Sequence, residues 1–220
     1  ESKANATDFV TRADREAHDL IVSVLEKETP DIPVLSEEGA QLPFETRRAW
    51  ERLWVVDPLD GTKEFLSRNG EFTVNIALVD QCVPVLGVVA VPALDIWYLA
   101  AGGFGAFRAA TADLDAAAGA EDTIAALQKR ATAISAAGGG GAQTETARVV
   151  ASRSHLNAET AAFIDALKQR YRDVELVQAG SAVKLCRVAE GEADFYPRLA
   201  PTMEWDTAAG DAVVREAGGT

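Results

Sequence analysis

A short apolar run at residues 53–56 leads directly into an acidic turn at residues 57–62, and this junction constrains the fold more than any other segment. The apolar run predicts a buried strand, the proline and glycine that follow it predict a tight turn, and residues 62–66 can open a helix. Asp57 and Asp60 are therefore expected to converge at the end of the strand. Taken alone, the segment is equally compatible with an acidic surface turn.

Backbone groups of the same turn can complete a site for a metal ion and a phosphate. Since the preceding proline fixes φ, the Leu59 carbonyl can turn toward Asp57 and Asp60, which gives three hard oxygen donors of the kind that Mg²⁺ prefers. The N–H groups of Gly61 and Thr62 would then face a phosphate at the start of the following helix.

Two further carboxylates lie where other predicted elements begin or end. Glu37 follows a short apolar run at residues 32–36, and Asp206 opens an Ala-rich segment that predicts a helix. Gathering these acids with Asp57 and Asp60 would cost several kcal/mol in repulsion and desolvation unless a cation binds among them. A divalent metal cluster is therefore expected if they meet, and if they do not, each is an ordinary solvated acid.

Thr11 predicts the start of a helix with an apolar spacing close to 3.6 residues. Asp14 falls in the first turn of this helix, where a carboxylate is favourable beside the helix dipole. A capping role is therefore an alternative to a catalytic role for Asp14. The expected apolar side consists of Ala13, Ala17, Leu20, Ile21, Val24 and Leu25.

The remaining chain predicts a meander followed by alternating strands and helices. Residues 72–107 predict about four antiparallel strands, and the glycine run at 138–141, within an Ala/Gly/Thr-rich stretch at 109–146, predicts a flexible linker. The alternation after the linker favours a layered α/β arrangement. Its expected strands are 148–151, 174–177 and 193–196, and its expected helices are 158–171, 182–189 and 206–217.

Composition excludes several classes of function. The 220 residues carry a formal net charge of −13, which argues against a general nucleic-acid surface. No apolar run reaches transmembrane length, no signal peptide is visible, and two cysteines suggest neither a disulfide framework nor a zinc site. A reducing cytoplasm is the simplest setting, with peripheral attachment to the inner membrane left open.

An acidic protein repels a phosphorylated substrate, so bound Mg²⁺ and local basic residues would have to overcome that field. Taken singly, each basic candidate is more simply explained as a solvent-facing charge. The candidates are Arg153, His155, Lys184 and Arg198.

Six ordered blocks resemble the Mg²⁺-dependent, lithium-sensitive phosphatases that include inositol monophosphatase and fructose bisphosphatase. The likeness is greatest to the CysQ-type 3'(2'),5'-bisphosphate nucleotidases, since Lys63-Glu64-Phe65 stands where inositol monophosphatases typically have Thr-Asn-Phe. Residues 152–155 and 180–184 point the same way. The six blocks are residues 8–14, 35–38, 57–65, 69–78, 152–155 and 205–210.

The resemblance implies an α/β (α+β layered) fold, the αβαβα five-layer sandwich of that family, with the active site between two halves. Residues 1–146 would form the half with most metal ligands and the phosphate loop. Residues 147–220 would contribute substrate contacts and the last metal ligand. The family has further elements at both ends, so the chain is expected to be incomplete, and a homodimer is left open.

The resemblance also implies roles for individual residues. Asp14, Glu37 and Thr62 would be catalytic, and the Thr62 hydroxyl, oriented by Asp14, would accept or relay the proton of the attacking water. Thr62 could instead only cap its helix. Two or three Mg²⁺ would be held by Glu37, Asp57, the Leu59 carbonyl, Asp60 and Asp206. Substrate contacts would come from Leu59, Asp60, Gly61, Thr62, Arg153, Ser154, His155, Lys184 and Asp206.

The implied reaction is hydrolysis of the 3'-phosphate of adenosine 3',5'-bisphosphate to AMP and phosphate, which clears a by-product of sulfate assimilation. Two alternatives stay open: an inositol monophosphatase, and a metal-responsive binding module without turnover. The combination of Asp14 and Thr62 with the acids argues against the binding module, because a chain without catalysis does not need that pair.

Overall fold

In the part of the chain that the structure describes, the helices are short except for three of 13 to 17 residues. The computed structural model describes residues 11–40, 42–138, 145–151 and 157–220. Within them the α-helices are α1 (Arg12–Glu28), α2 (Phe44–Arg47), α3 (Thr62–Ser67), α4 (Thr111–Ala118), α5 (Thr123–Arg130), α6 (Ala158–Arg170), α7 (Val183–Ala189) and α8 (Glu204–Glu216), with 3₁₀ turns η1 (Pro92–Leu94) and η2 (Ala136–Gly138). None of these helices is long and apolar enough to cross a bilayer.

The strands form one large sheet and one small one. The seven-stranded sheet has the order β1 to β7, in which β1 and β2 are parallel and all later neighbours are antiparallel. The two-stranded sheet pairs β8 with β9 in parallel. The bounds are β1 (Val34–Ser36), β2 (Arg52–Asp60), β3 (Thr73–Asp80), β4 (Val83–Val91), β5 (Ile96–Ala101), β6 (Gly105–Ala109), β7 (Thr132–Ile134), β8 (Thr146–Ala151) and β9 (Asp173–Gln178).

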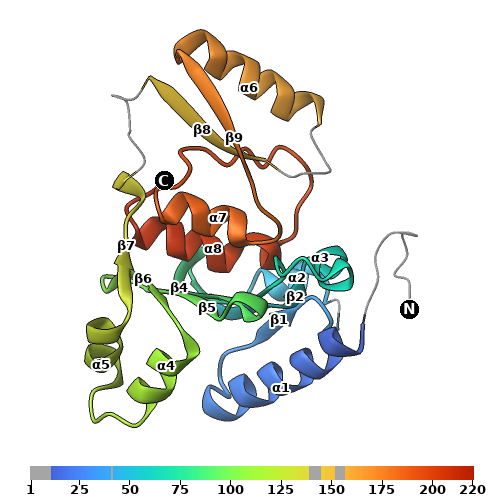
Figure 1. Cartoon of the computed structure of the whole chain (residues 1–220). Helices are drawn as coiled ribbons and strands as arrows, with labels where there is room; N and C mark the ends of the chain where they lie inside the picture. The colour runs from blue at the N-terminus through green and yellow to red at the C-terminus, as the bar shows by residue number, and fades with distance from the viewer. Residues whose placement is uncertain (1–10, 41, 139–144, 152–156) are drawn as a thin grey trace.

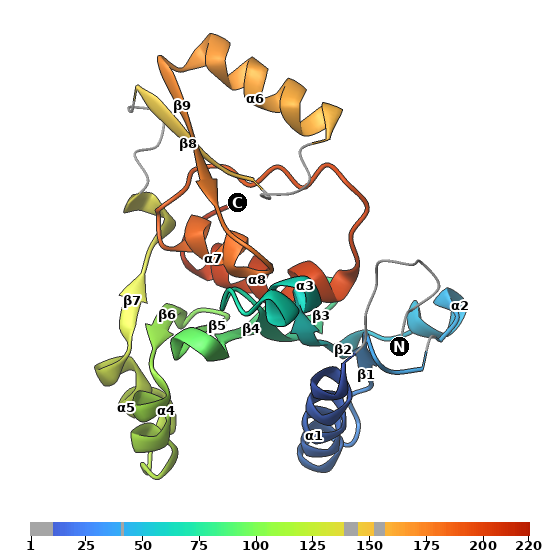
Figure 2. The ribbon, with the colours of Figure 1, turned by 45° about the vertical axis from the view of Figure 1, so that its right-hand side comes forward.

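Figures 1 and 2 show five layers. Helix α1 and the pair α4 and α5 lie on one face of the large sheet, and α7 and α8 lie on the other. The small sheet follows beyond α7, and α6 forms the outermost layer (Figure 1). The predicted αβαβα five-layer sandwich is therefore confirmed, whereas the division into halves at residues 146 and 147 stays a prediction.

Helix α1 begins where the sequence predicts. The Thr11 hydroxyl accepts the Ala13 N–H at 3.1 Å, and Asp14 accepts the Thr11 N–H at 2.9 Å, so the two side chains form a capping box. The predicted apolar side is too wide, because Leu20 and Val24 are 66% and 50% exposed. Helix α1 packs on β1 and β2, and these two side chains lie outside that contact.

The acidic segment continues β2 instead of forming a separate tight turn. Strand β2 runs to Asp60, and its pairing with β3 shifts register between Asp57 and Asp60. The chain turns at Gly61, whose φ of 87° lies in the left-handed region that favours glycine. Because Gly61 is the N-cap of α3, the alternative in which Thr62 caps the helix is wrong.

The predicted meander is confirmed as β3 to β6, whereas two later predictions need correction. The stretch taken as containing a linker forms α4, α5 and β7, and most of its glycine run lies outside the described residues. Residues 193–196 form no strand, and only a single bridge joins Val149 to Phe195. The Asp194 carboxylate accepts the Arg148 N–H at 2.7 Å, so a side chain takes the donor that a continued ladder would use.

The main core lies between the large sheet and helices α7 and α8. Val89 and Tyr98 from the sheet belong to the same buried cluster as Trp205 and Val213 from α8. Helix α8 approaches β4 at Gly87, where an added Cβ would meet the Ala209 carbonyl oxygen and lie 2.8 Å from the Ala212 Cβ. This close approach holds the middle of α8 over the sheet.

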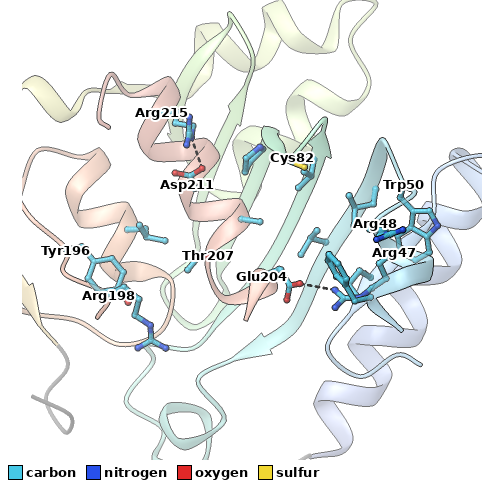
Figure 3. A pocket seen from close by; sticks show the side chains of 18 residues that line it. Arg47, Arg48, Trp50, Cys82, Tyr196, Arg198, Glu204, Thr207, Asp211 and Arg215 are labelled. Atoms are coloured by element: carbon cyan, nitrogen blue, oxygen red, sulfur yellow. Dashed lines mark hydrogen bonds and ion pairs between the residues drawn. The ribbon is translucent and has the colours of Figure 1, made fainter. Parts of the chain in front are cut away.

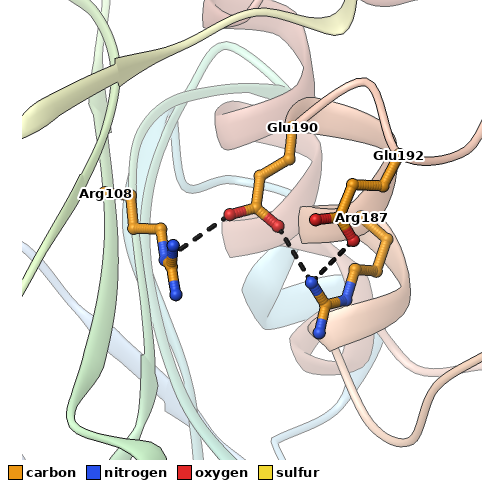
Figure 4. A network of polar contacts seen from close by, with 4 residues as sticks. All are labelled: Arg108, Arg187, Glu190 and Glu192. Carbon is orange, nitrogen blue, oxygen red and sulfur yellow. Dashed lines mark hydrogen bonds and ion pairs between the residues drawn. The ribbon is translucent and has the colours of Figure 1, made fainter.

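A polar network ties the end of α7 to the large sheet (Figure 4). Glu190 lies 3.5 Å from Arg108 on β6 and 3.3 Å from Arg187, which also pairs with Glu192 at 2.7 Å. Burial raises the pKa of Glu190, and hydrogen bonding to the Tyr98 hydroxyl partly offsets this effect. The charged network and the core therefore fix α7 against the same sheet.

We expect Gly87→Ala to destabilise the fold by about 1–3 kcal/mol, since the new methyl group would overpack the contact between β4 and α8. Urea unfolding followed by circular dichroism measures the change. Gly119→Ala is the matched control, because an added Cβ there meets nothing within 4 Å, and it should change stability by less than about 0.5 kcal/mol. Equal stability of the two variants would contradict the proposed close contact.

Candidate metal and phosphate site

Acidic side chains converge at the end of β2. Asp57 is 1% exposed, and burial raises its pKa well above the usual range, with further raising by the charges of Asp60, Glu37 and Asp206. Glu37 follows β1, which pairs with β2, and Asp206 lies in the first turn of α8. The structure therefore brings together four predicted acids from three elements.

The pKa of Asp60 is raised by the same combination of burial and neighbouring acids. Burial raises its pKa to about 6, Lys184 acts in the opposite direction, and Asp206 and Glu37 raise it further. A carboxylate whose ionised form is destabilised by burial and by like charges gains most from a cation. The carboxylates of this cluster therefore need positive charge close to them.

Lys184 supplies part of that charge from α7. Burial lowers its pKa, while Asp60 raises it and Arg198 lowers it. Its Nζ lies 5.9 Å from the centre of the Tyr196 ring, close enough for a cation–π contact. The predicted basic residue therefore lies at the acidic cluster, and its role toward a substrate stays a prediction.

Asn75 on β3 adds an unusual polar group beneath the cluster. It is fully buried and lies directly opposite Asp57 in the antiparallel register, so both side chains project from the same face. Neither its Oδ1 nor its Nδ2 has a hydrogen-bond partner among the described residues. Buried polar groups in proteins nearly always form hydrogen bonds. The side-chain amide of Asn75 therefore fits a site in which a metal ion binds together with coordinated water.

The carboxylates are turned toward their own loops. Asp57 accepts the Leu59 N–H at 3.0 Å, and Asp206 accepts the Thr202 hydroxyl at 2.6 Å and the Met203 N–H at 3.1 Å. Within the described part of the chain, no three acidic, His or Cys side chains already stand together as a ligand set. The donor chemistry fits a divalent cation, and the final ligand geometry would require side chains to rotate.

Ser181 connects the acidic loop to the segment before α7. Its hydroxyl donates to the Asp60 carbonyl at 2.9 Å, and its φ of 47° places a non-glycine residue in the left-handed region. A Cβ at Gly61 would collide with the Ser181 hydroxyl oxygen. Gly61 was predicted as a phosphate contact, and the structure gives it this additional role. No spacing in the sequence indicates Ser181, because the contact spans 121 positions.

Asp14, which was predicted to orient the Thr62 hydroxyl, is hydrogen-bonded to Thr11. Asp14 is buried and accepts both the N–H and the hydroxyl of Thr11, which confirms the capping role that the sequence left open. Within the described residues no hydrogen bond joins Asp14 to Thr62, so their catalytic pairing stays a prediction. Arg153, Ser154 and His155 lie outside the described residues.

A cavity of about 630 Å³ lies beside the acidic cluster (Figure 3). Arg47 pairs with Glu204 at 2.8 Å and Arg215 pairs with Asp211 at 2.6 Å on its walls. Asp57, Asp60 and Thr62 are not among its lining residues. Arg198 borders the cavity and lies 3.8 Å from Asp206, so the cavity adjoins the predicted site without containing it.

The chain belongs to the inositol monophosphatase family, whose model matches residues 1–220. The predicted family membership is therefore confirmed. The chain is 44% identical over 212 residues to the 3'(2'),5'-bisphosphate nucleotidase CysQ of Escherichia coli K12, covering 95% of this chain and 74% of that protein. It is 39% identical to the corresponding protein of Buchnera aphidicola, covering 96% and 69%.

Solved structures support the same placement. CysQ from Bacteroides thetaiotaomicron, a bacterial member of the inositol monophosphatase family, matches with a TM-score of 0.79 and 50% identity over 93% of this chain and 72% of its own. An inositol monophosphatase from Thermotoga maritima matches with a TM-score of 0.68 and 30% identity, covering 98% and 72%.

We expect Asp60→Asn to stabilise the metal-free protein at pH 7. The pKa of Asp60 is about 6 in the folded state and 3.8 in an ordinary environment, so its ionised form costs stability above pH 6. That cost is relieved as the pH falls toward 3.8, and the advantage of the variant should vanish there. Melting temperatures in EDTA measure it, at about 2–4 °C per kcal/mol.

The control for this experiment is Asp165→Asn, because Asp165 is exposed on α6 and pairs with the exposed Lys168. It should show no comparable pH-dependent gain. Added Mg²⁺ should raise the melting temperature of the native protein more than that of Asp60→Asn. A metal-free Asp60→Asn protein that melts below the native protein at pH 7 would show that Asp60 is not under repulsive strain.

Proposed function

We propose that the chain is a Mg²⁺-dependent phosphomonoesterase that removes the 3'-phosphate of adenosine 3',5'-bisphosphate, leaving AMP and inorganic phosphate. The observation that carries this proposal is the group of carboxylates around the buried Asp57 at the end of β2, in which burial and mutual repulsion raise the pKa of Asp57 and Asp60. The similarity to CysQ nucleotidases supports the choice of substrate. The reaction would clear a by-product of sulfate assimilation.

The residues that would hold two or three Mg²⁺ come from three elements. They are Glu37, Asp57, the Leu59 carbonyl, Asp60 and Asp206. When bound, such ions lower the pKa of a coordinated water and neutralise charge on the phosphate and the leaving oxygen. The buried Asn75 lies next to Asp57 and can donate to or accept from a water at the same place.

Other groups of the chain would position the substrate and move the proton. The N–H groups of Gly61 and Thr62 lie at the start of α3 and would face the reacting phosphate. The Thr62 hydroxyl would accept or relay the proton of the attacking water, passing its own proton to Asp14 after that carboxylate rotates from Thr11. Lys184 would lie near the second phosphate, and Arg153, Ser154 and His155 would contact the nucleotide.

The first alternative, also a phosphomonoesterase, is an inositol monophosphatase, because the inositol monophosphatase of Thermotoga maritima has a similar fold. A binding module without turnover is the rival from another class. We expect the chain to hydrolyse adenosine 3',5'-bisphosphate with a higher kcat/KM than myo-inositol 1-phosphate, and only with Mg²⁺ present. A preference for inositol phosphate, or an absence of turnover with both compounds, would reject the proposed substrate or the proposed enzyme, respectively.

The substrate preference should depend on Lys184, which is half-buried at the acidic cluster. Lys184→Met should lower kcat/KM for the nucleotide about ten- to a hundredfold, since one charge-assisted contact is worth about 1.5–3 kcal/mol. Turnover of inositol phosphate, which lacks the second phosphate, should fall much less. Lys168→Met on the exposed face of α6 is the control, and an equal fall for both substrates would instead make Lys184 part of the metal or reacting-phosphate site.

We also expect Li⁺ to inhibit turnover. The resemblance to the family implies that the four acids would hold one Mg²⁺ weakly, and a small hard cation could enter such a position after a turnover. Initial rates over a series of LiCl concentrations, with matched NaCl controls, measure the effect. Equal rates in millimolar LiCl and NaCl would contradict a weakly held Mg²⁺ position.

A further inference from the structure

Helix α1 presents two polar side chains on one face, one turn apart. Asp14 is buried at the first turn, and His18, four residues later, is half-buried. Residues at this spacing project from the same side of a helix. Because α1 packs on β1 and β2, this side faces the strands that lead into the acidic cluster.

His18 contacts the end of β1. Its Nδ1 lies 2.8 Å from the hydroxyl oxygen of Ser36, which is the last residue of β1 and is 3% exposed. Ser36 pairs with Val56 in the parallel register of β1 and β2. Glu37 therefore follows Ser36 just as Asp57 follows Val56, so Glu37, directly after β1, lies beside Asp57 within β2.

The imidazole ring also packs against the turn that carries Glu37. The Glu37 N–H donates to the Val56 carbonyl at 3.1 Å, and the Gly39 N–H donates to the Ser36 carbonyl at 3.0 Å. A Cβ on Gly39 would lie 3.5 Å from His18 Cε1 and 3.2 Å from the Ser36 carbonyl oxygen. Two backbone hydrogen bonds thus set the path of the turn, and His18 is the side chain that supports it from α1.

We propose that His18 is a positioning residue for a divalent cation: through Ser36 it fixes the turn of Glu37 so that this carboxylate and Asp57 can bind one ion. The inference rests on the proposed function, because it assigns the ion to that site. Its physical basis is entropic, since a carboxylate on a loosely held turn must be ordered before it can bind. The cost of that ordering is lowered when the turn is already held.

The test uses two replacements of His18. His18→Leu removes the polar contact and keeps an apolar side chain against Gly39. His18→Asn keeps a hydrogen-bonding group near the position of Nδ1. Binding of Mg²⁺ and of Mn²⁺ without substrate, measured by isothermal titration calorimetry, should weaken about ten- to a hundredfold in His18→Leu and by less than about threefold in His18→Asn, as is typical for groups that orient a metal ligand.

Ser36→Ala cuts the same hydrogen bond from its other end. It should weaken cation binding as His18→Leu does, and the double variant should be no weaker than either single one, because both remove one interaction. Kinetically, His18→Leu should need more Mg²⁺ for half-maximal activity, while KM for the phosphate substrate at saturating Mg²⁺ stays within about twofold of the native value. Leu20→Ala on the exposed side of α1 is the matched control.

The outcomes separate this inference from the proposed function. Native-like cation binding by His18→Leu, even with a lower melting temperature, would show that His18 only packs against the turn and would overturn the inference while leaving the enzyme proposal standing. A native protein that binds no divalent cation would also overturn it. Weakened binding in His18→Leu and Ser36→Ala would support it even if the native protein hydrolysed neither phosphate compound.

Discussion

Repulsion among buried carboxylates at the end of β2 is the constraint on which the arrangement of the surrounding elements depends. Asp57 and Asp60 lie within one strand, and their pKa values rise because burial and like charges disfavour ionisation. A fold can retain such a group only if its packing elsewhere outweighs the cost. Here the close contact of α8 with β4 at Gly87 and the core around Tyr98 and Trp205 supply that packing.

Residues distant in sequence complete the same site from the other side. Ser181 donates to the Asp60 carbonyl, and Lys184, one turn further along, lies in the field of the Asp60 carboxylate. The end of α7 is held to the large sheet through Glu190 and Arg108. Because α7 is held at both ends, the position of Lys184 near the acids is set by a helix that is packed on the sheet. The same segment is therefore tied both to the acidic cluster and to the large sheet.

The sequence predicts the elements that carry the site better than the contacts between them. Local signals are sufficient for the start of β2, for α3 and for the N-cap of α1, because apolar runs, glycine and a capping threonine act over a few residues. They do not predict that residues 57–60 continue β2. They fail at residues 193–196, where the Asp194 side chain takes the Arg148 N–H, and at Leu20, which is apolar but exposed. Ser181, Asn75 and His18 could not be identified, because their importance comes from register and from long-range contacts. The resemblance to a family supplied the roles that periodicity could not.

The acids differ in how firmly the backbone holds them, and this difference shapes how an ion can enter. Asp57 lies within β2, opposite Asn75 of β3 and directly after Val56, the last residue that pairs with β1, so its backbone is held by the sheet. Asp206 lies at the start of α8, and its carboxylate accepts hydrogen bonds from Thr202 and Met203 that must be exchanged for a cation. The attraction of a divalent ion in a buried site is strong enough to offset two ordinary hydrogen bonds, each worth about 1 kcal/mol. Cation binding is therefore expected to begin at the strand acids and to draw in the helix acid, with Glu37 held ready by the turn beside them.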